Sequence, residues 1–546
     1  MDSSPARPWI LAWVAPLTFV VHALGAHADR IGLWGDDALY LSMAESLRRG
    51  GPLVAEALPG APGVAKYPLL WPASIAALQD LGASLNAILI LNAALWAVAA
   101  QLVVSRLMPS FQASWRAQVA AGLMIAVNTM TMDLVPQLMS EALFTLALVC
   151  ALTIVVRGAE RPRSWVALAL CTAIAASTRN VGGLYALGGG FLAFVAGHRR
   201  ESAALLSGWA VAAVALHVER SLTTLPTGPT LELLRYYVSY DVHTGWYADR
   251  WAAGGLGELA RGTLHIVRGN LNYGPKSLGL YLAPTAWADA ASGAAPGLGT
   301  VGVGCAAFVA GALASWQAPK ARPIALLLLL HIAVFLLWTW PFSSRFWLPV
   351  FPLVVALGAT AVDRLGNVGK LLVLPVAALT VALNGLQPFY TARVRLLGEA
   401  PIAEADAATR EEEAALTRTV AGIRDRVRPG DVLAGEATVF WFAHPVGASA
   451  VELRNLVPFA ASLEETFDIP RTAAAKAATS EAFATNLRTL RALTPPERTV
   501  WIAYDPRRME PQRDWIRDAL AAGVLTAEAE IGMLRLLSVT PAPGSN

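Results

Sequence analysis

Two adjacent carboxylates, Asp36 and Asp37, have the chemistry and the position of an active-site pair. They follow a long apolar segment, Trp9 to Gly25, and they precede apolar side chains at helical spacing: Leu39, Met43, Ala44 and Leu47. The pattern predicts a membrane span and then an interfacial helix, with both acids at the junction. Ionisable groups at a bilayer edge that face protein are functional candidates. The alternative is that both acids cap the following helix at its N-terminus.

Further acids and cations fall in other predicted outer loops or at the span ends beside them. The acids are Asp133 and Glu141, and the cations are Lys66, Arg179 and Arg345. A carboxylate can accept a proton from a hydroxyl or an amine, while fixed cations can stabilise a departing phosphate. Together they suit group transfer from a lipid phosphate donor, whose headgroup lies at the membrane interface. Glu141 and Asp133 could instead be structural acids, and Arg179 and Arg345 could extend to the interface as anchors.

The composition is that of a polytopic membrane protein with a soluble portion. The chain has 546 residues, of which 55% are hydrophobic and 15% charged, with a mean hydropathy of +0.49. Soluble proteins carry about 25% charged residues. A net charge of +3 is too small to indicate a nucleic-acid partner. The three cysteines, Cys150, Cys171 and Cys305, lie in apolar segments and form no disulfide or zinc pattern.

About eleven membrane spans are expected. After the first, at Trp9 to Gly25, they are 84–106, 117–131, 138–156, 164–179, 181–197, 202–218, 298–315, 323–340, 346–362 and 371–388. Every second loop carries basic residues: Arg7, Arg106, Arg116, Arg157, Arg161, Arg163, Arg199, Arg200, Lys320, Arg322, Arg364 and Lys370. The positive-inside rule makes these loops cytoplasmic. It places the N-terminus inside, the C-terminus outside, and the candidate site residues on the outer face of the membrane. We expect this membrane to be a bacterial-type inner membrane.

Two regions outside the spans have a composition of their own. The predicted outer loop 219–297 is rich in aromatic residues, which form either an interfacial belt or a stacking surface and lid for a sugar or a lipid. From about residue 395 to 546, short strand-like runs alternate with helical stretches. This alternation predicts a small α/β domain outside the membrane. We find neither a glycine-rich phosphate loop nor a catalytic triad in it.

The candidate residues stand in motifs that resemble those of the GT-C membrane glycosyltransferases. Asp36-Asp37-Ala38-Leu39-Tyr40 looks like the Asp-Glu motif of their first outer loop, here residues 28–67. Lys66-Tyr67-Pro68-Leu69-Leu70-Trp71-Pro72 is similar to the Lys-Pro-Pro segment that closes the loop. Three later segments resemble patterns at outer edges: Ser140-Glu141-Ala142-Leu143-Phe144, Thr178-Arg179-Asn180-Val181-Gly182 and Ser344-Arg345-Phe346-Trp347-Leu348-Pro349. The likeness covers roughly residues 8–390.

The resemblance implies a fold and a reaction. The relevant branch contains protein O-mannosyltransferases and aminoarabinose transferases, with a polyprenyl-phosphate sugar donor, an inverting single displacement and a periplasmic site. It makes Asp36 the base, Asp37 its catalytic partner, and Lys66 a phosphate ligand. Tyr40, Glu141, Arg179 and Arg345 become further substrate-binding or phosphate-binding candidates. Asp37 replaces the usual Glu and one proline is missing, so the sugar and the acceptor (a lipid, a glycan or a protein) stay open.

Other functions and a metal requirement are also open. A transporter would line a path with these charges, and a non-catalytic membrane subunit would present the C-terminal domain to partners. The two acids could hold a divalent cation, but no complete ligand set is visible. Burial beside the membrane and the charge of Asp37 predict a raised pKa for Asp36, and a nearby Lys66 would oppose that rise.

The loop arginines generate a prediction about topology. A reporter fused to the C-terminus of the full chain should be active only outside the cytoplasm, because eleven spans carry the chain from an inside N-terminus to an outside C-terminus. The measurement is alkaline phosphatase activity against that of a cytoplasmic fluorescent reporter at the same junction. A cytoplasmic signal contradicts both the count and the placement of the small domain.

Overall fold

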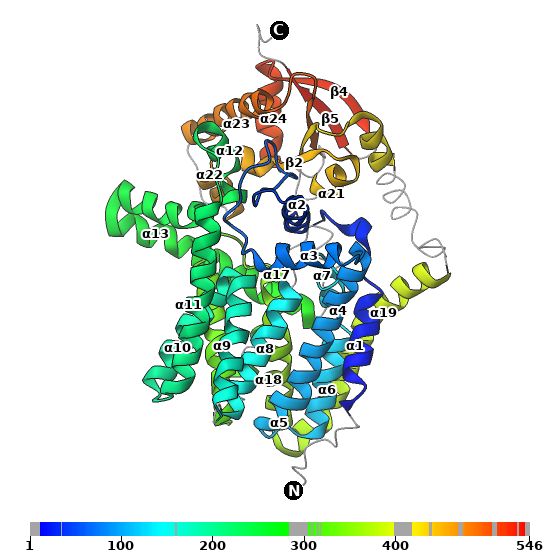
Figure 1. Cartoon of the computed structure of the whole chain (residues 1–546), viewed down its shortest axis with the longest axis vertical. Helices are drawn as coiled ribbons and strands as arrows, with labels where there is room; N and C mark the ends of the chain where they lie inside the picture. Colours follow the sequence, from blue (N-terminus) through cyan, green and yellow to red (C-terminus); the bar gives the residue numbers. More distant parts are fainter. Residues whose placement is uncertain are drawn as a thin grey trace.

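A computed structural model shows a helical domain and a domain containing strands, stacked end to end (Figure 1). The residues that it describes are 11–33, 35–158, 161–282, 304–306, 309–313, 316, 318–397, 418–435, 439–467, 473–504, 510–531 and 534–540. Helices α2 and α3 lie at the junction of the two domains (Figure 1). That junction is where the predicted site residues fall.

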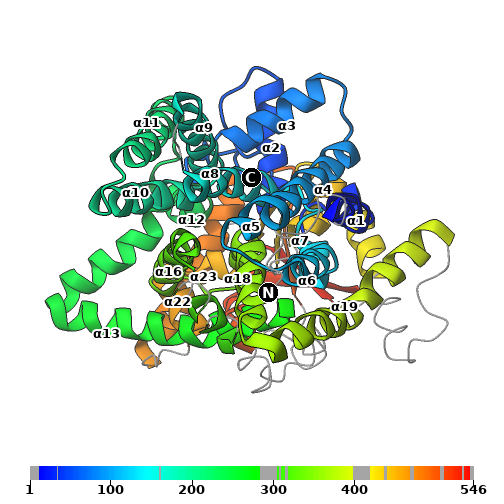
Figure 2. The same ribbon diagram turned by 90° about the horizontal axis from the view of Figure 1, so that it is seen from below.

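The helical domain is a bundle of apolar helices. They are α1 (Val14–Ala23), α4 (Leu85–Leu102), α5 (Met108–Ser110), α6 (Trp115–Ala126), α7 (Thr129–Leu134), α8 (Glu141–Arg157), α9 (Pro162–Thr178), α10 (Asn180–Val195), α11 (Arg199–Leu222), α16 (Arg322–Leu336), α17 (Ser344–Trp347), α18 (Phe351–Asp363) and α19 (Gly366–Leu397). Local chemistry explains several ends: the hydroxyls of Ser84 and Ser114 cap α4 and α6, and Gly158 closes α8 at a φ of 84°. Figure 2 shows α9, α10 and α11 grouped on one side of the bundle and α1, α4 and α6 on another.

Four described segments are long and apolar enough to cross a membrane by length and composition: Leu85–Ser110, Arg199–Ser221, Pro319–Leu336 and Ser344–Asp363. The prediction of a helical membrane protein is confirmed at that level. Described helices also overlie the other predicted spans, except that most of 298–315 lies outside the described residues. The count of eleven stays a prediction.

The helix predicted after the acidic pair is confirmed, and protein covers it on every side; its position at the membrane interface stays a prediction. Helix α2 runs over Asp36–Arg48 and is followed by α3 (Leu70–Asp80). Every α2 side chain from Asp37 to Ala44 is buried, on all sides of the helix. The strand-containing domain covers the side that was expected to face the interface, and Leu39 shares one apolar core with Leu433 and Phe440.

The predicted outer loop 219–297 is helical over most of its described part. It contains α12 (Gly228–Val238) and α13 (Asp241–Leu282), and α13 has non-helical backbone angles at Gly254 and Gly255. Residues 283–297 lie outside the described part of the chain. Figure 2 places α13 along the edge of the molecule.

The C-terminal region contains a five-stranded sheet and helices, as expected for the predicted small α/β domain. Its strands are β1 (Val432–Gly435), β2 (Ser449–Glu452), β3 (Val500–Tyr504), β4 (Leu525–Ile531) and β5 (Leu534–Val539), in the order β2-β1-β3-β5-β4. The first three strands in this order are parallel, and β5 and β4 add antiparallel pairs. The helices are α21 (Val439–Ala443), α22 (Phe459–Thr466), α23 (Ala473–Leu493) and α24 (Glu510–Ala521). The start of the predicted domain, up to residue 417, includes residues outside the described part.

Hydrogen bonds hold this sheet domain against the first outer loop and against α12. The Ala450 amide donates to the Ala57 carbonyl at 2.8 Å, and the Glu452 amide donates to the Tyr237 hydroxyl at 2.8 Å. Gly32, at a φ of 99°, lies so close to Trp441 that an added Cβ would stand 2.5 Å from its backbone nitrogen. The position therefore admits only glycine, for conformation and for space.

We predict that Gly32→Ala lowers the melting temperature of the purified chain more than Gly60→Ala does. Gly60 has a φ of 73° but no neighbour within 4 Å of an added Cβ, so its substitution isolates the backbone strain, about 1–2 kcal/mol. Gly32→Ala adds overpacking against Trp441, typically about 1–3 kcal/mol. Equal melting temperatures for the two variants would contradict the close approach of the two domains.

Candidate active site

The two acids of the opening motif have different partners. Both oxygens of Asp37 accept backbone amides of its own segment, from Gly32 and Ala38, each at 2.9 Å. The Asp36 carboxylate instead accepts the Tyr67 hydroxyl at 2.5 Å and the Arg345 guanidinium at 2.6 Å. Asp36 retains 24% side-chain exposure, whereas Asp37 is fully buried. The helix-start role that was considered for both acids therefore suits Asp37, while Asp36 faces the other candidate residues.

Arg345 connects Asp36 to Glu141. Its Nη1 lies 2.6 Å from Asp36 Oδ2, and its Nε donates to Glu141 Oε1 at 2.7 Å. Arg179 forms a second ion pair with the same Glu141 oxygen. Because Glu141 is 2% exposed, these charges lie in a low-dielectric setting where each depends on its partners. Residues from four distant parts of the chain thus form one network.

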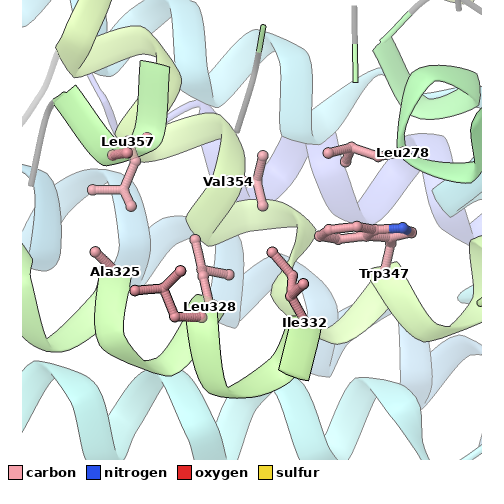
Figure 3. Close-up of a pocket in the computed structure, with 10 residues that line it drawn as sticks. Leu278, Ala325, Leu328, Ile332, Trp347, Val354 and Leu357 are labelled. Carbon is pink, nitrogen blue, oxygen red and sulfur yellow. The ribbon is translucent and has the colours of Figure 1, made fainter. Parts of the chain in front are cut away.

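The segment around Arg345 is fixed by aromatic packing. Trp347, two residues on, stacks on Phe342 with 4.7 Å between ring centroids, and its indole donates to the Gly274 carbonyl at 2.9 Å. Behind Trp347 lies an apolar cavity of about 60 Å³, lined by Leu328, Val354 and other side chains of α13, α16 and α18 (Figure 3). This packing sets the position of α17 and therefore the direction from which Arg345 reaches the acids.

Lys66 lies close to this network but has no carboxylate of its own. Its ammonium donates to the Tyr236 carbonyl at 2.9 Å and lies 3.8 Å from the centroid of the Tyr236 ring. The rings of Tyr67 and Tyr240 are 5.3 Å and 5.7 Å from it. Among the described residues, no carboxylate oxygen lies within 4.0 Å of the ammonium, although the side chain is buried. A buried cation held by rings and a carbonyl remains able to bind an anion.

Backbone bonds hold the Lys66 segment between two helices. The Asn180 side chain at the start of α10 donates to the Lys66 carbonyl at 2.9 Å, and the Ala65 amide donates to the Val238 carbonyl at 2.9 Å. The same α10 start follows Arg179 directly. Lys66 and Arg179 are therefore positioned by one element, although 113 positions separate them.

The charges set the pKa values of the groups outside the spans. Burial raises the pKa of Asp36, but Arg345, Lys66 and the Tyr67 hydroxyl outweigh it, so the pKa lies below the ordinary value. The predicted rise is therefore wrong, because Arg345 supplies a cation that the prediction did not include. Burial raises the pKa of Asp37 to about 6, against the amide bonds that lower it. Burial lowers the pKa of Lys66 to about 8, against the charges of Asp36 and Glu452.

All the residues to which the resemblance gives a site role lie in or beside the network. Tyr40 is buried, its hydroxyl is 3.3 Å from Ser140 Oγ, and its ring meets that of Tyr67 edge-on at 5.1 Å. Tyr40 therefore packs beside the network, and a contact with substrate stays a prediction. Asp133 lies elsewhere and forms a 2.6 Å ion pair with Arg30.

Sequence reasoning missed the contribution of the sheet domain. Glu452 and Arg454, which form an ion pair there, lie next to the site, and the Arg454 guanidinium is 4.4 Å from the Trp340 ring centroid. No motif marks these two residues. Tyr67 and Tyr236 had a signal: Tyr67 stands beside Lys66 in its motif, and Tyr236 is one of the loop aromatics.

A divalent cation has few candidate ligands here. The described residues contain no group of three or more His, Cys, Asp or Glu side chains that could hold a metal ion. Asp36 and Asp37 bind different partners, so they present no shared pair of oxygens.

Comparisons with known proteins give low-identity structural likenesses. The sequence matches no protein-family model and no curated protein. The crystal structure of ArnT from Cupriavidus metallidurans bound to undecaprenyl phosphate is 12% identical, with a TM-score of 0.48, and the match covers 98% of this chain and 99% of that chain. The archaeal oligosaccharyltransferase AglB from Archaeoglobus fulgidus, in complex with an inhibitory peptide and a dolichol-phosphate, is 11% identical, with a TM-score of 0.46 and coverage of 91% and 69%. Because both scores are below 0.5, we draw neither fold nor function from them.

The network predicts a large stability effect at Glu141. Glu141→Gln keeps the shape but removes the charge that Arg179 and Arg345 share, and breaking a buried pair typically costs about 3–5 kcal/mol. Asp133→Asn is the matched control, because it breaks a more exposed pair worth about 1 kcal/mol or less. Thermal unfolding of both variants in one detergent measures the difference. A Glu141 variant as stable as the Asp133 variant would contradict the network.

Proposed function

We propose that this chain is a membrane glycosyltransferase that moves a sugar from a polyprenyl-phosphate donor to a lipid, glycan or protein acceptor on the outer face of the membrane. One observation carries the proposal: Lys66, a buried cation without a described carboxylate partner, lies beside the Asp36–Arg345 ion pair. Such a cation can bind the phosphate that leaves the sugar, and the ionised carboxylate beside it can accept the proton of the acceptor. The resemblance of the motifs to GT-C enzymes supplies the sugar donor.

In this proposal Lys66 binds the donor phosphate. A charge-assisted contact to phosphate is about twice as strong as a neutral hydrogen bond. Arg345, which is ion-paired with Asp36, adds positive potential where the leaving phosphate gains charge. The Tyr236 and Tyr240 rings around Lys66 exclude water from the contact.

Asp36 receives the proton of the acceptor. The acceptor oxygen attacks the anomeric carbon of the sugar as the bond from that carbon to the phosphate oxygen breaks, and the electron pair leaves with the polyprenyl phosphate. The hydroxyl proton passes to Asp36, whose oxygens each keep a free lone pair beside their Tyr67 and Arg345 bonds. A low-pKa base suits this concerted step because the hydroxyl becomes acidic only as the new bond forms. Asp37 holds the loop that presents Asp36 and acts as a positioning residue.

The geometry weighs against the two rival functions. A transporter needs charges near the middle of its spans. Here Glu141 is the first residue of α8, and Arg345 precedes α18. A subunit that only presents the sheet domain does not require Asp36, Lys66 and Arg345 to gather in one buried place, as they do.

Substitution of Asp36 tests its role as the base. Asp36→Asn keeps the size of the side chain but cannot accept the proton, so the transfer rate should fall about 10²–10⁴-fold with saturating donor and acceptor. Asp37→Asn is the matched control. It weakens one of the two amide bonds that hold the loop, so it should lower the melting temperature, and the rate per folded molecule should fall far less than in Asp36→Asn.

The measurement is sugar transfer by purified chain in lipid, with the folded fraction determined for each variant. If Asp36→Asn transfers at near the wild-type rate, Asp36 is not the base. If binding of undecaprenyl phosphate, the carrier held by one structural neighbour, is unchanged in a variant that cannot transfer, the loss belongs to the chemical step.

The pKa of Lys66 predicts how donor affinity depends on pH. With a pKa of about 8, Lys66 is protonated below pH 8 and neutral above it. Undecaprenyl phosphate should therefore bind up to about tenfold more weakly for each pH unit above 8, because binding must first restore the proton. Lys66→Arg, which stays charged, should bind without this decline, and Lys66→Ala should bind weakly at every pH. An identical pH profile for wild type and Lys66→Arg would contradict the phosphate contact.

A further inference from the structure

A groove in the helical domain carries an inference separate from the proposed reaction. Its volume is about 640 Å³, and it lies among α8, α9, α10, α11 and α16. Along α10 it extends from Gly182 to Ala196, about 21 Å at 1.5 Å per residue. This is longer than the hydrocarbon thickness of one leaflet, about 15 Å.

The depth of the groove is apolar. Leu152, Ala186 and Leu327 are typical of its wall. The two polar side chains deeper in the groove have partners of their own: Thr172 donates to the Leu168 carbonyl, and Tyr185 bonds to His331. The outer side of α10 is exposed and apolar, as expected for a surface in lipid, with Phe191 65% exposed.

The mouth of the groove is charged and mostly basic. Arg157, Lys320 and Arg322 line it together with His198 and a single acid, Glu201. All three permanent cations are exposed, and none of them has a carboxylate partner within 4.0 Å among the described residues. Three cations face one carboxylate, so the mouth is suited to an anion.

The mouth lies far from the proposed active site. Arg157 is the last residue of α8, and Glu141 is the first, so their backbones are about 24 Å apart along the helix axis. The mouth residues are among the basic residues that the positive-inside rule assigns to the cytoplasmic side. A headgroup at the mouth therefore belongs to the opposite leaflet from the donor phosphate.

We propose that this groove binds an anionic glycerophospholipid of the inner leaflet, with its phosphate at the Arg157–Lys320–Arg322 mouth and an acyl chain in the apolar depth. Basic pockets between membrane helices on the cytoplasmic side are suited to such headgroups. The apolar length accommodates the chain, and the charge at the mouth selects the anionic headgroup over a zwitterionic one.

The headgroup contact is tested by native mass spectrometry of the full chain with phosphatidylglycerol or phosphatidylcholine of identical acyl chains. Wild type should retain phosphatidylglycerol preferentially. In the triple variant Arg157→Gln, Lys320→Gln, Arg322→Gln, the affinity for phosphatidylglycerol should fall about fivefold for each cation removed. The control variant Arg106→Gln, Arg161→Gln, Arg163→Gln removes the same charge from exposed arginines that do not line the groove, and it should bind as wild type. Equal retention of both lipids, or equal losses in both variants, overturns the proposal.

The contact with the acyl chain of the lipid is tested by substitution of two glycines of α10. An added Cβ makes ordinary contacts at both: 3.7 Å from Leu205 at Gly189, which lines the groove, and 3.6 Å from Trp209 at Gly183, which does not. Gly189→Leu should fill the groove and weaken phosphatidylglycerol binding, while Gly183→Leu should not. Equal binding by the two variants overturns the proposal. So does displacement of phosphatidylglycerol by undecaprenyl phosphate in a Lys66-dependent way, because the groove would then belong to the donor.

Discussion

The ion pairs of Arg345 are the constraint on which the candidate site depends. A guanidinium this buried is tolerated only if its charge is balanced and its donors are bonded, and Asp36 and Glu141 do both. Glu141 in turn shares its charge with Arg179. The result is that α2, α8, the end of α9 and α17 cannot shift independently without exposing an unpaired charge to an apolar interior.

The sheet domain completes this arrangement from the other side. It buries α2 and brings Glu452 and Arg454 next to the site. Its Trp441 lies so close to Gly32 of the first outer loop that there is no room for a side chain at Gly32. Removal of water strengthens every electrostatic interaction beneath it. The same burial holds the pKa of Lys66 near 8 and leaves that cation available for an anion. A cover of this kind supplies low-dielectric surroundings, which the proposed departure of a phosphate would use.

Residue type and sidedness predicted most of the side chains that gather. Asp36, Lys66, Glu141, Arg179 and Arg345 all stand in predicted outer loops or at the span ends beside them, and the structure brings them together. Asp133, chosen on the same grounds, pairs with Arg30 elsewhere. The sequence could not predict which of these side chains bind each other, because that depends on the direction in which each side chain points. Asp36 and Asp37 are equivalent in the sequence, yet Asp37 accepts amides of its own segment whereas Asp36 binds Arg345. The contact with Arg345 lowers the pKa of Asp36, which was expected to be raised. The burial of α2 depends on packing against residues some 400 positions away, which no local pattern reports.

The central claim is that an anion binds at Lys66 beside Asp36. An experimental structure of the full chain with undecaprenyl phosphate tests it most directly. The account predicts a phosphate oxygen within hydrogen-bond distance of Lys66 Nζ, with the Asp36 carboxylate beside the bound phosphate and accessible to an acceptor hydroxyl. A phosphate bound at another place, with Lys66 still enclosed by Tyr67, Tyr236 and Tyr240, would contradict it.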